Sequence, residues 1–355
     1  MKITYIAICY SSSESGVGKK IQDQISFWRS RGHQVLLYLL TSQASNNDWV
    51  VSKIADRIWI DDKYVTKQKN RRDVFALAKK NEAEIVYFRD AFPFYFKSNK
   101  IKKVLEVNSI QKNEVTAQSF MKKTIYSLLA RYYYSRWDGF VYVTEEIKSS
   151  LEREIPAMAK LPSTVISNGI NLGRIPRLPV SQASNLNFVF LGEPGLPWNG
   201  ISSIVDLASA LPGCNFHVIG ESNLSKFETT PNMNFYGFMR QADYQNVLKL
   251  CQVAIGTMEV ERKKMVQGCS LKTREYLAAG LPVVIRYEET DFQEGAQDFI
   301  LNLPVDGKPM SFYSEQIAEF AEKWRFERVA ISEVSTISIE LKEAKRIEFL
   351  SSLIR

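Results

Sequence analysis

The stretch QGCSLKTREYLAAGLPVVI (Gln267–Ile285) predicts a helix followed by a buried strand, with an anion site where the helix begins. Ser270 is a favourable N-cap, and it leaves the backbone amides of Leu271 and Lys272 available to a ligand. These amides and the helix dipole attract negative charge, and Lys272 adds a mobile cation. Glu275 lies one turn further along, where its carboxylate can accept hydrogen bonds from a ribose diol beside bound phosphates. The stretch therefore indicates a nucleotide site.

Apolar runs and helical stretches alternate almost from end to end of the 355 residues. Such alternation is typical of parallel sheets covered on both faces. The pattern pauses at a proline-containing segment and then restarts, so we expect two doubly wound Rossmann-like α/β domains facing a central cleft, with ligands at the carboxyl ends of the strands. The expected division is a first domain at 1–172, a linker at 173–186, a second domain at 187–325, and a C-terminal helical segment at 326–355 that can pack back on the first domain.

The apolar runs predict the individual strands. In the first half these are Ile3–Cys9, Gln34–Leu40, Ile85–Phe88, Val104–Val107, Phe140–Val143 and Thr164–Ser167. In the second half they are Phe188–Leu191, Asn215–Ile219, Asn234–Tyr236, Gln252–Ile255, Pro282–Ile285 and Phe299–Leu303. Helices are expected at Gly18–Arg31, Gly200–Leu211, Ala242–Leu250, Leu271–Ala279 and from Ser314 onward, with an amphipathic stretch at Val115–Trp137.

Composition and charge narrow the class of protein. With 45% apolar and 24% charged residues, four scattered cysteines and two histidines, we expect a globular, reduced, cytosolic chain without a metal site. No apolar run approaches the ~18–20 residues that cross a bilayer. Residues 1–170 carry 27 Lys and Arg against 17 Asp and Glu, a balance of +10, whereas the whole chain has +7. This asymmetry suggests an anionic partner for the first half, and a plain solvated basic surface explains it equally well.

The loop YSSSESGVGKK (residues 10–20) looks at first like a phosphate-binding P-loop. A P-loop needs a glycine, four residues, and then Gly-Lys-Ser/Thr. Ser13 stands where the first glycine belongs and Lys20 stands where the hydroxyl belongs, so the P-loop interpretation fails. Gly16 and Gly18 still lie between a strand and a helix, where glycine lets a ligand approach the backbone.

Six motifs occur in order along the chain and identify a family resemblance. They are Arg31-Gly32-His33-Gln34-Val35, Asn168-Gly169-Ile170-Asn171, FVFLGEPGLPWNG at Phe188–Gly200, Val218-Ile219-Gly220-Glu221, Phe235-Tyr236-Gly237-Phe238, and EYLAAGLPVV at Glu275–Val284. In this order and spacing they resemble the retaining glycosyltransferases of family four, which have the two-domain GT-B fold. The resemblance covers most of the chain.

The resemblance implies the positions that bind a nucleotide sugar and carry the reaction. The matching donor-site positions are Gly16, Gly18, Gly192, Asn199, Gly200, Gly220, Phe238, Gln267, Ser270, Leu271, Lys272 and Glu275. The implied catalytic residues are Lys272, Glu275 and Asn108, the last at a place where many relatives have a histidine.

The chain departs from the family pattern at three donor-site positions. Gln267 stands where the family has a second glutamate, while Glu193 and Asn199 stand where it has basic residues that neutralise the diphosphate. We expect other cations to take over that neutralisation, namely Lys272, Arg274 or the run Arg262-Lys263-Lys264.

The expected activity is transfer of a hexose-type sugar from a nucleoside diphosphate sugar, UDP-linked in preference to GDP-linked, with retention of configuration. The sequence has no Asp-x-Asp motif, so we expect no cofactor and no obligatory metal. Preorganised donors and cations at the diphosphate would then carry the catalysis. The alternative is a non-catalytic GT-B partner or stabilising subunit, which the departures at Gln267, Glu193 and Asn199 favour.

The expected acceptor is a sugar or a lipid-linked sugar in the synthesis of a cell-surface polysaccharide or glycoconjugate. The basic first half suits an anionic membrane surface as well, so we expect a cytoplasmic protein that can bind peripherally at the inner membrane face. The lysines expected on that surface are Lys97, Lys100, Lys102, Lys103, Lys122 and Lys123. No nucleic-acid-binding module is recognisable, and we expect no nucleic-acid partner.

Overall fold

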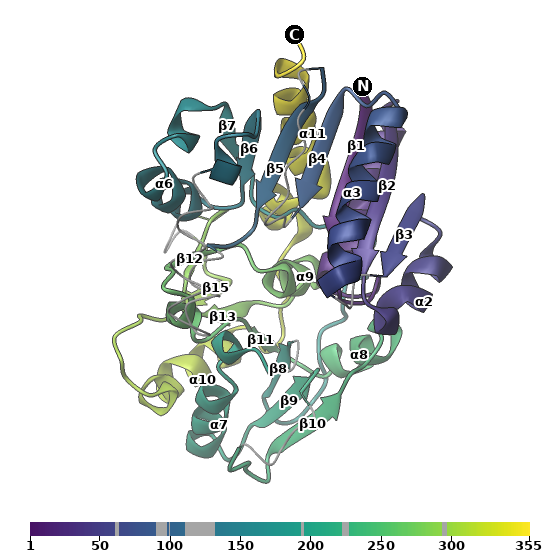
Figure 1. The fold of residues 1–355 in the computed structure, drawn as a ribbon. Helices are drawn as coiled ribbons and strands as arrows, with labels where there is room; N and C mark the ends of the chain where they lie inside the picture. The colour runs from purple at the N-terminus through teal and green to yellow at the C-terminus, as the bar shows by residue number, and fades with distance from the viewer. Residues whose placement is uncertain are drawn as a thin grey trace. The chain divides into compact units, whose positions relative to one another are not determined.

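The computed structural model describes residues 1–60, 64–89, 98, 100–110, 132–192, 195–221, 227–292 and 297–355 (Figure 1). The chain divides into two compact units. The first unit comprises Met1–Gly169 together with Ile339–Arg355, and the second unit comprises Ile170–Ser338. Residues 173–186 belong to the second unit, where the Leu178 amide donates to the Ala279 carbonyl at 2.9 Å. Most of the predicted amphipathic stretch Val115–Trp137 lies outside the described residues.

The first unit is built on a sheet of seven parallel strands in the order β3-β2-β1-β4-β5-β6-β7. The central strands are apolar and buried on both faces because helices cover them. The order of the strands reverses between β1 and β4. The bounds are β1 Lys2–Ile8, β2 Gln34–Thr41, β3 Arg57–Ile60, β4 Ile85–Arg89, β5 Lys102–Val107, β6 Gly139–Tyr142 and β7 Ser163–Val165.

Hydroxyl side chains begin three of the helices around this sheet. Ser15 Oγ accepts from the Gly18 amide at 3.1 Å, and Ser42 and Thr144 cap the next two in the same way. The last helix returns from the far end of the chain, packs against the first one, and is seen behind β4 and β5 in Figure 1. Among the described residues of this unit, the α-helices are α1 Gly16–Ser30, α2 Gln43–Ser52, α3 Tyr64–Lys80, α6 Glu145–Glu154 and α11 Ile339–Ser352.

The second unit repeats this architecture with six parallel strands in the order β10-β9-β8-β11-β13-β15. Here the order reverses between β8 and β11. The strands are β8 Asn187–Leu191, β9 Asn215–Ile219, β10 Met233–Gly237, β11 Val253–Ile255, β13 Val283–Ile285 and β15 Ile300–Asn302. A small separate sheet pairs β12 Gln267–Gly268 with β14 Glu288–Glu289. In the described parts of this unit, the α-helices are α7 Ile201–Ala210, α8 Gln241–Leu248, α9 Leu271–Ala279 and α10 Ser314–Lys323. The described 3-10 helices are η1 Met158–Lys160 in the first unit and η2 Pro197–Asn199, η4 Val260–Lys263, η5 Met310–Tyr313 and η6 Ile331–Ile337 in the second.

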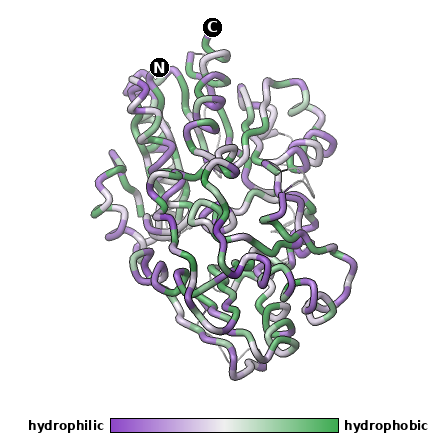
Figure 2. Tube along the Cα trace, turned by 180° about the vertical axis from the view of Figure 1, so that it is seen from behind, coloured by the Kyte–Doolittle hydropathy of each residue, from purple (hydrophilic) through white to green (hydrophobic). Residues whose placement is uncertain are grey.

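Apolar residues follow the strands and the inner faces of the helices (Figure 2). In the second unit they form one core cluster on each face of the sheet, so the helices on both faces are held by burial of hydrophobic surface. The polar residues that concern function lie in the loops that follow the strands, on helices α1, α8 and α9, and in one strand of the first unit.

Two of these loops, after β8 and β9, approach each other at Gly192 and Gly220. Gly220 has φ +101°, and a Cβ there would overlap the Gly192 carbonyl oxygen. Gly220→Ala should therefore lower the free energy of unfolding, measured with urea, by about 3 kcal/mol or more through backbone strain and overpacking. Gly213→Ala is the matched control, because a Cβ at Gly213 meets nothing within 4 Å. Equal losses in the two variants would contradict this account of the sheet edge.

Candidate functional site

The candidate site lies at the carboxyl edge of the second sheet, where β8 and β9 end. The Gly192 amide donates to the Ile219 carbonyl at 3.0 Å, and the Gly220 amide donates to the Gly237 carbonyl at 2.6 Å. The first bond joins the loop after β8 to the end of β9, and the second joins the loop after β9 to the end of β10. In doubly wound sheets, ligands bind at this edge, beside the point where the strand order reverses.

Asn199 and Gly200 stand beside the same edge. Asn199 ends η2 and is almost fully buried, with its Nδ2 about 3.0 Å from where a Cβ on Gly192 would lie. Gly200 is the N-cap of α7 with φ +72°, and a Cβ there would press on Met258. The structure thus brings together four of the predicted donor-site residues: Gly192, Asn199, Gly200 and Gly220.

Helix α9 begins at this group of residues, as its motif predicts. Ser270 is the N-cap residue, but its side chain makes no capping hydrogen bond. The ammonium of Lys272 donates to Asn199 Oδ1 at 2.9 Å and lies 4.1 Å from the centre of the Phe190 ring. Within the described part of the chain, Lys272 has no carboxylate partner. A cation without a counter-ion, at a helix N-terminus, is an attractive position for an anion.

The charge of Lys272 depends on pH near neutrality. The side chain is half-buried. Burial, and then the positive charge of Lys263, lower the pKa of Lys272 to about 7. Lys263 itself lies with its ammonium 3.9 Å from the centre of the Trp198 ring. A bound anion would favour the protonated form of Lys272.

Glu275 lies one turn into α9, and its carboxylate is held by a residue that sequence reasoning missed. The hydroxyl of Tyr244, on α8, donates to Glu275 Oε1. Burial, and then the charge of Glu275, raise the pKa of Tyr244, so this hydroxyl stays protonated. Tyr244 carries no motif and sits among the apolar positions of its helix, so the sequence offers no signal for the contact.

Two other predicted donor-site residues take different positions. Gln267 lies in β12 and its Nε2 donates to Glu288 Oε2 at 3.4 Å. Phe238 follows β10, which is two strands from β8 in the sheet order, and its side chain is 75% exposed.

The cations proposed to replace the missing basic residues are not equivalent. Arg274 is fully buried and pairs with Glu289 at 2.7 Å and Asp291 at 2.6 Å, so the expectation that it could serve the diphosphate is wrong. The reason is that position 274 faces into the unit, where two acidic side chains of the β14 segment require a cation. Arg262 pairs with Glu259.

In the first unit, the predicted glycines begin α1. Gly16 is the first residue of the helix. A Cβ on Gly18 would come within 2.5 Å of the carbonyl oxygens of Ser12 and Ser13. The packing of this loop against the start of α1 therefore requires glycine at position 18, independently of any bound ligand.

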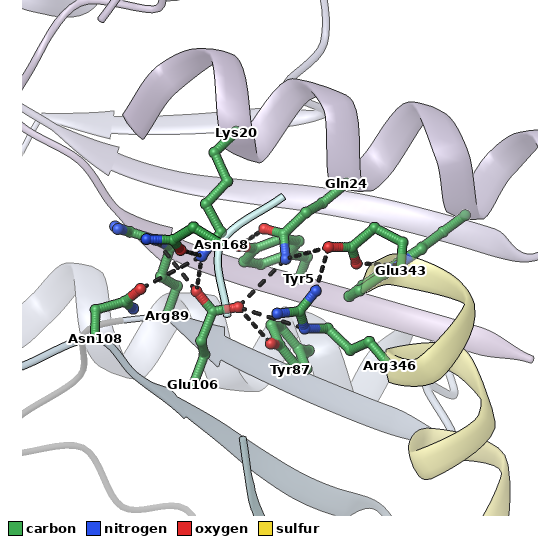
Figure 3. Close-up of polar contacts among 11 residues, drawn as sticks. Tyr5, Lys20, Gln24, Tyr87, Arg89, Glu106, Asn108, Asn168, Glu343 and Arg346 are labelled. Carbon is green, nitrogen blue, oxygen red and sulfur yellow. Dashed lines mark hydrogen bonds and ion pairs between the residues drawn. The ribbon is translucent and has the colours of Figure 1, made fainter. Parts of the chain in front are cut away.

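Asn108 follows β5 and joins a polar cluster that the sequence analysis did not identify (Figure 3). Its Oδ1 accepts from the ammonium of Lys20 at 3.4 Å, and Asn168 Oδ1 accepts from the same ammonium at 2.7 Å. The signal that could have revealed the cluster is Glu106, a carboxylate between the apolar residues Leu105 and Val107 of β5, because a buried charge needs buried partners.

The lysines expected on a basic surface are described only in part. Lys100 and Lys102 are exposed, but Lys103 is buried and pairs with Asp138 at 2.5 Å, so its place on that surface is a wrong prediction. Lys97, Lys122 and Lys123 lie outside the described residues. Among the residues searched, no helix is long and apolar enough to span a membrane, and no cluster of three or more His, Cys, Asp or Glu could hold a metal ion.

No family model and no curated protein sequence matches the chain. Solved structures do match, over nearly the whole length. Sucrose-phosphate synthase from Thermosynechococcus elongatus is 12% identical with a TM-score of 0.73, covering 99% of this chain and 98% of that one. HepE of Anabaena, solved with UDP and glucose, is 15% identical with a TM-score of 0.69, covering 98% and 99%. WaaG, a glycosyltransferase involved in lipopolysaccharide biosynthesis, is 12% identical with a TM-score of 0.69, covering 99% and 100%.

These likenesses establish the fold. The chain has the GT-B fold, with two parallel-sheet α/β domains, as the sequence predicted.

Replacing Arg274 should cost stability. Arg274→Ala leaves Glu289 and Asp291 without their buried cation, and we expect a loss of about 3 to 5 kcal/mol in the free energy of unfolding. Arg262→Ala is the control, because its side chain is 57% exposed and pairs with one carboxylate; we expect a loss of at most about 1 kcal/mol. An Arg274→Ala protein of unchanged stability would show that this arginine is not a structural cation.

Proposed function

We propose that the protein is a retaining glycosyltransferase that moves a hexose from a nucleoside diphosphate sugar, UDP-linked in preference to GDP-linked. The acceptor is a sugar or lipid-linked sugar in the synthesis of a cell-surface polysaccharide or glycoconjugate. One observation carries the proposal: at the carboxyl edge of the second sheet, Lys272 presents an ammonium that Asn199 orients and that has no carboxylate partner among the described residues.

The chemistry of sugar transfer needs a cation of this kind. When the bond between the anomeric carbon and the diphosphate breaks, negative charge accumulates on the diphosphate oxygens. Lys272, the amides at the start of α9 and the helix dipole would stabilise that charge more strongly in the transition state than in the bound donor. The function requires no metal in this arrangement, in keeping with the absence of Asp-x-Asp from the sequence.

Glu275 is suited to hold the ribose of the donor. A carboxylate has about four lone-pair sites, so the bond from Tyr244 leaves it able to accept from ribose hydroxyls. The choice of UDP draws support from HepE, which was also solved with UDP-glucose. We assign the acceptor to the first unit, because the positive excess lies in the first half of the chain. For the same reason we place the protein in the cytoplasm, bound peripherally to the anionic inner face of the membrane.

A non-catalytic GT-B partner is the second candidate, and the substitutions at Gln267, Glu193 and Asn199 favour it. The two candidates differ in turnover. A non-catalytic partner could bind a nucleotide sugar without releasing nucleotide. An enzyme must bind the nucleotide sugar and also release the nucleotide after transfer.

The test is a panel of UDP- and GDP-linked sugars, with calorimetry for binding and a nucleotide-release assay for transfer to alkyl glycosides and to alkyl diphospho-sugars. Binding of a UDP-sugar together with acceptor-dependent UDP release supports the enzyme, and an α-linked product from an α-linked donor supports retention. Binding without release under all conditions would establish the non-catalytic partner. Failure of every nucleotide sugar to bind would refute the proposal.

The affinity for UDP-glucose should fall as the pH rises through about 7. Burial lowers the pKa of Lys272 to about 7, so the cation is present below that pH and lost above it. The diphosphate diester does not titrate in this range, and we expect a fall of up to about tenfold per pH unit above 7 with uptake of a proton on binding. Lys272→Arg, which stays charged, should bind with nearly the same affinity from about pH 6 to about pH 8.5. Parallel pH dependences in the two proteins, measured by calorimetry, would show that Lys272 is not the titrating group.

A further inference from the structure

The polar cluster of the first unit gathers side chains from α1, β1, β4, β5 and α11, together with Asn108 just after β5 and Asn168 three residues after β7 (Figure 3). Its centre is Glu106, whose side chain is fully buried. Tyr87 donates to Glu106 Oε2 at 2.5 Å and Gln24 donates to the same oxygen at 3.3 Å. Three cations surround the carboxylate: Lys20 at 2.6 Å, Arg89 at 3.6 Å and Arg346 at 3.7 Å.

Glu106 is ionised in this environment. Burial alone would raise its pKa, but Lys20, Arg346 and Arg89 hold the pKa of Glu106 well below its usual range. The ion pair with Lys20 is consequently a fixed feature of the folded first unit at neutral pH. A carboxylate so placed determines where the Lys20 ammonium lies.

The last helix of the chain, α11, contributes two charged residues to this cluster. Arg346, on α11, pairs with Glu343 of the same helix and also faces Glu106. Glu343 accepts from Trp28 Nε1 at 2.9 Å and from Gln24 Nε2 at 3.3 Å. Helix α11 therefore ties α1, and with it Lys20, to the strand that carries Glu106.

Lys20 orients two asparagines on the other side of the cluster. Its ammonium donates to Asn168 Oδ1 at 2.7 Å and to Asn108 Oδ1 at 3.4 Å. An ammonium has donors only, so the oxygen of each side-chain amide must face Lys20. The Nδ2 group of each asparagine consequently points away from the ammonium.

The asparagines occupy the outer end of the cluster. Lys20 is fully buried, whereas Asn108 and Asn168 are half-buried. Asn108 follows the carboxyl end of β5, and Asn168 comes soon after β7. Both thus stand at the edge of the parallel sheet where doubly wound domains bind their ligands.

We propose that Lys20 is a positioning residue, which sets the side-chain amides of Asn108 and Asn168 so that their N–H groups donate to oxygen atoms of the sugar acceptor. This inference rests on the proposed function and adds Lys20 and Asn168 to it. Asn108 and Asn168 touch the acceptor, and Lys20 acts through them. Replacing Lys20 alone by an apolar residue should destabilise the fold, because the buried Glu106 would lose its closest cation. An apolar residue at position 20 would be stabilising only if Glu106 were replaced as well.

The test replaces the donor group and keeps the bond to Lys20. Asn168→Asp and Asn108→Asp retain an oxygen for the ammonium but lose the N–H donors, so the folded protein should melt at the same temperature or higher. With UDP-glucose as donor and alkyl glycosides or alkyl diphospho-sugars as acceptors, the acceptor KM should rise at least about tenfold for Asn168→Asp. The calorimetric affinity for UDP-glucose should not change. Asn246→Asp is the matched control, because Asn246 Oδ1 accepts from Lys249 at 3.1 Å on an exposed helix surface.

A double-variant cycle separates positioning from a structural role. Lys20→Met should raise the acceptor KM, and adding Asn168→Asp to it should have little further effect, because Lys20 acts through the asparagine. Additive effects, or an unchanged acceptor KM in Asn168→Asp, would overturn the inference while leaving the proposed function intact. A parent protein that binds UDP-glucose but transfers to none of these acceptors would refute the proposed enzyme activity and this inference with it.

Discussion

A lysine ammonium bound by an asparagine carbonyl oxygen stands beside the carboxyl edge of the sheet in each unit. In the first unit, Lys20 is also paired with Glu106 and is fully buried, so its charge is neutralised and its position is fixed. In the second unit, Lys272 is held by Asn199 and, over the described ranges, has no carboxylate beside it. The first lysine can orient other groups, whereas the second can meet a ligand's negative charge. On this contrast we base the proposal that the first unit orients the acceptor and that the second unit binds the diphosphate.

The backbone around Lys272 is shaped by contacts that exclude side chains. Gly192 and Gly220 lie against each other, and Gly200 turns the chain into α7 with a positive φ. Phe190 closes one side of the lysine. A ligand at this edge would therefore meet main-chain groups, the Lys272 ammonium and the start of α9, which together suit an oxyanion.

The sequence predicted the parts of the molecule that local patterns encode. Leu271–Ala279 and Asn215–Ile219 have the bounds that were predicted, because a capped helix and an apolar strand are written in consecutive residues. Helix α2 was missed because it buries only Ser45 and Trp49 and has no apolar stripe. The partners of Glu106 and of Arg274 could not be predicted, since they come from other segments of the chain. Nothing in the local pattern distinguishes a cation that meets a ligand from one that neutralises a buried carboxylate.

The central claim is that the second unit binds the donor through the start of α9. Hydrogen exchange of the whole chain, measured with and without saturating UDP-glucose, tests it most directly because bound diphosphate should protect the amides that it contacts. The account predicts slower exchange in residues 268–275 and in the segment after β8 that leads to Asn199. Binding of UDP-glucose that leaves exchange in both segments unchanged would contradict it.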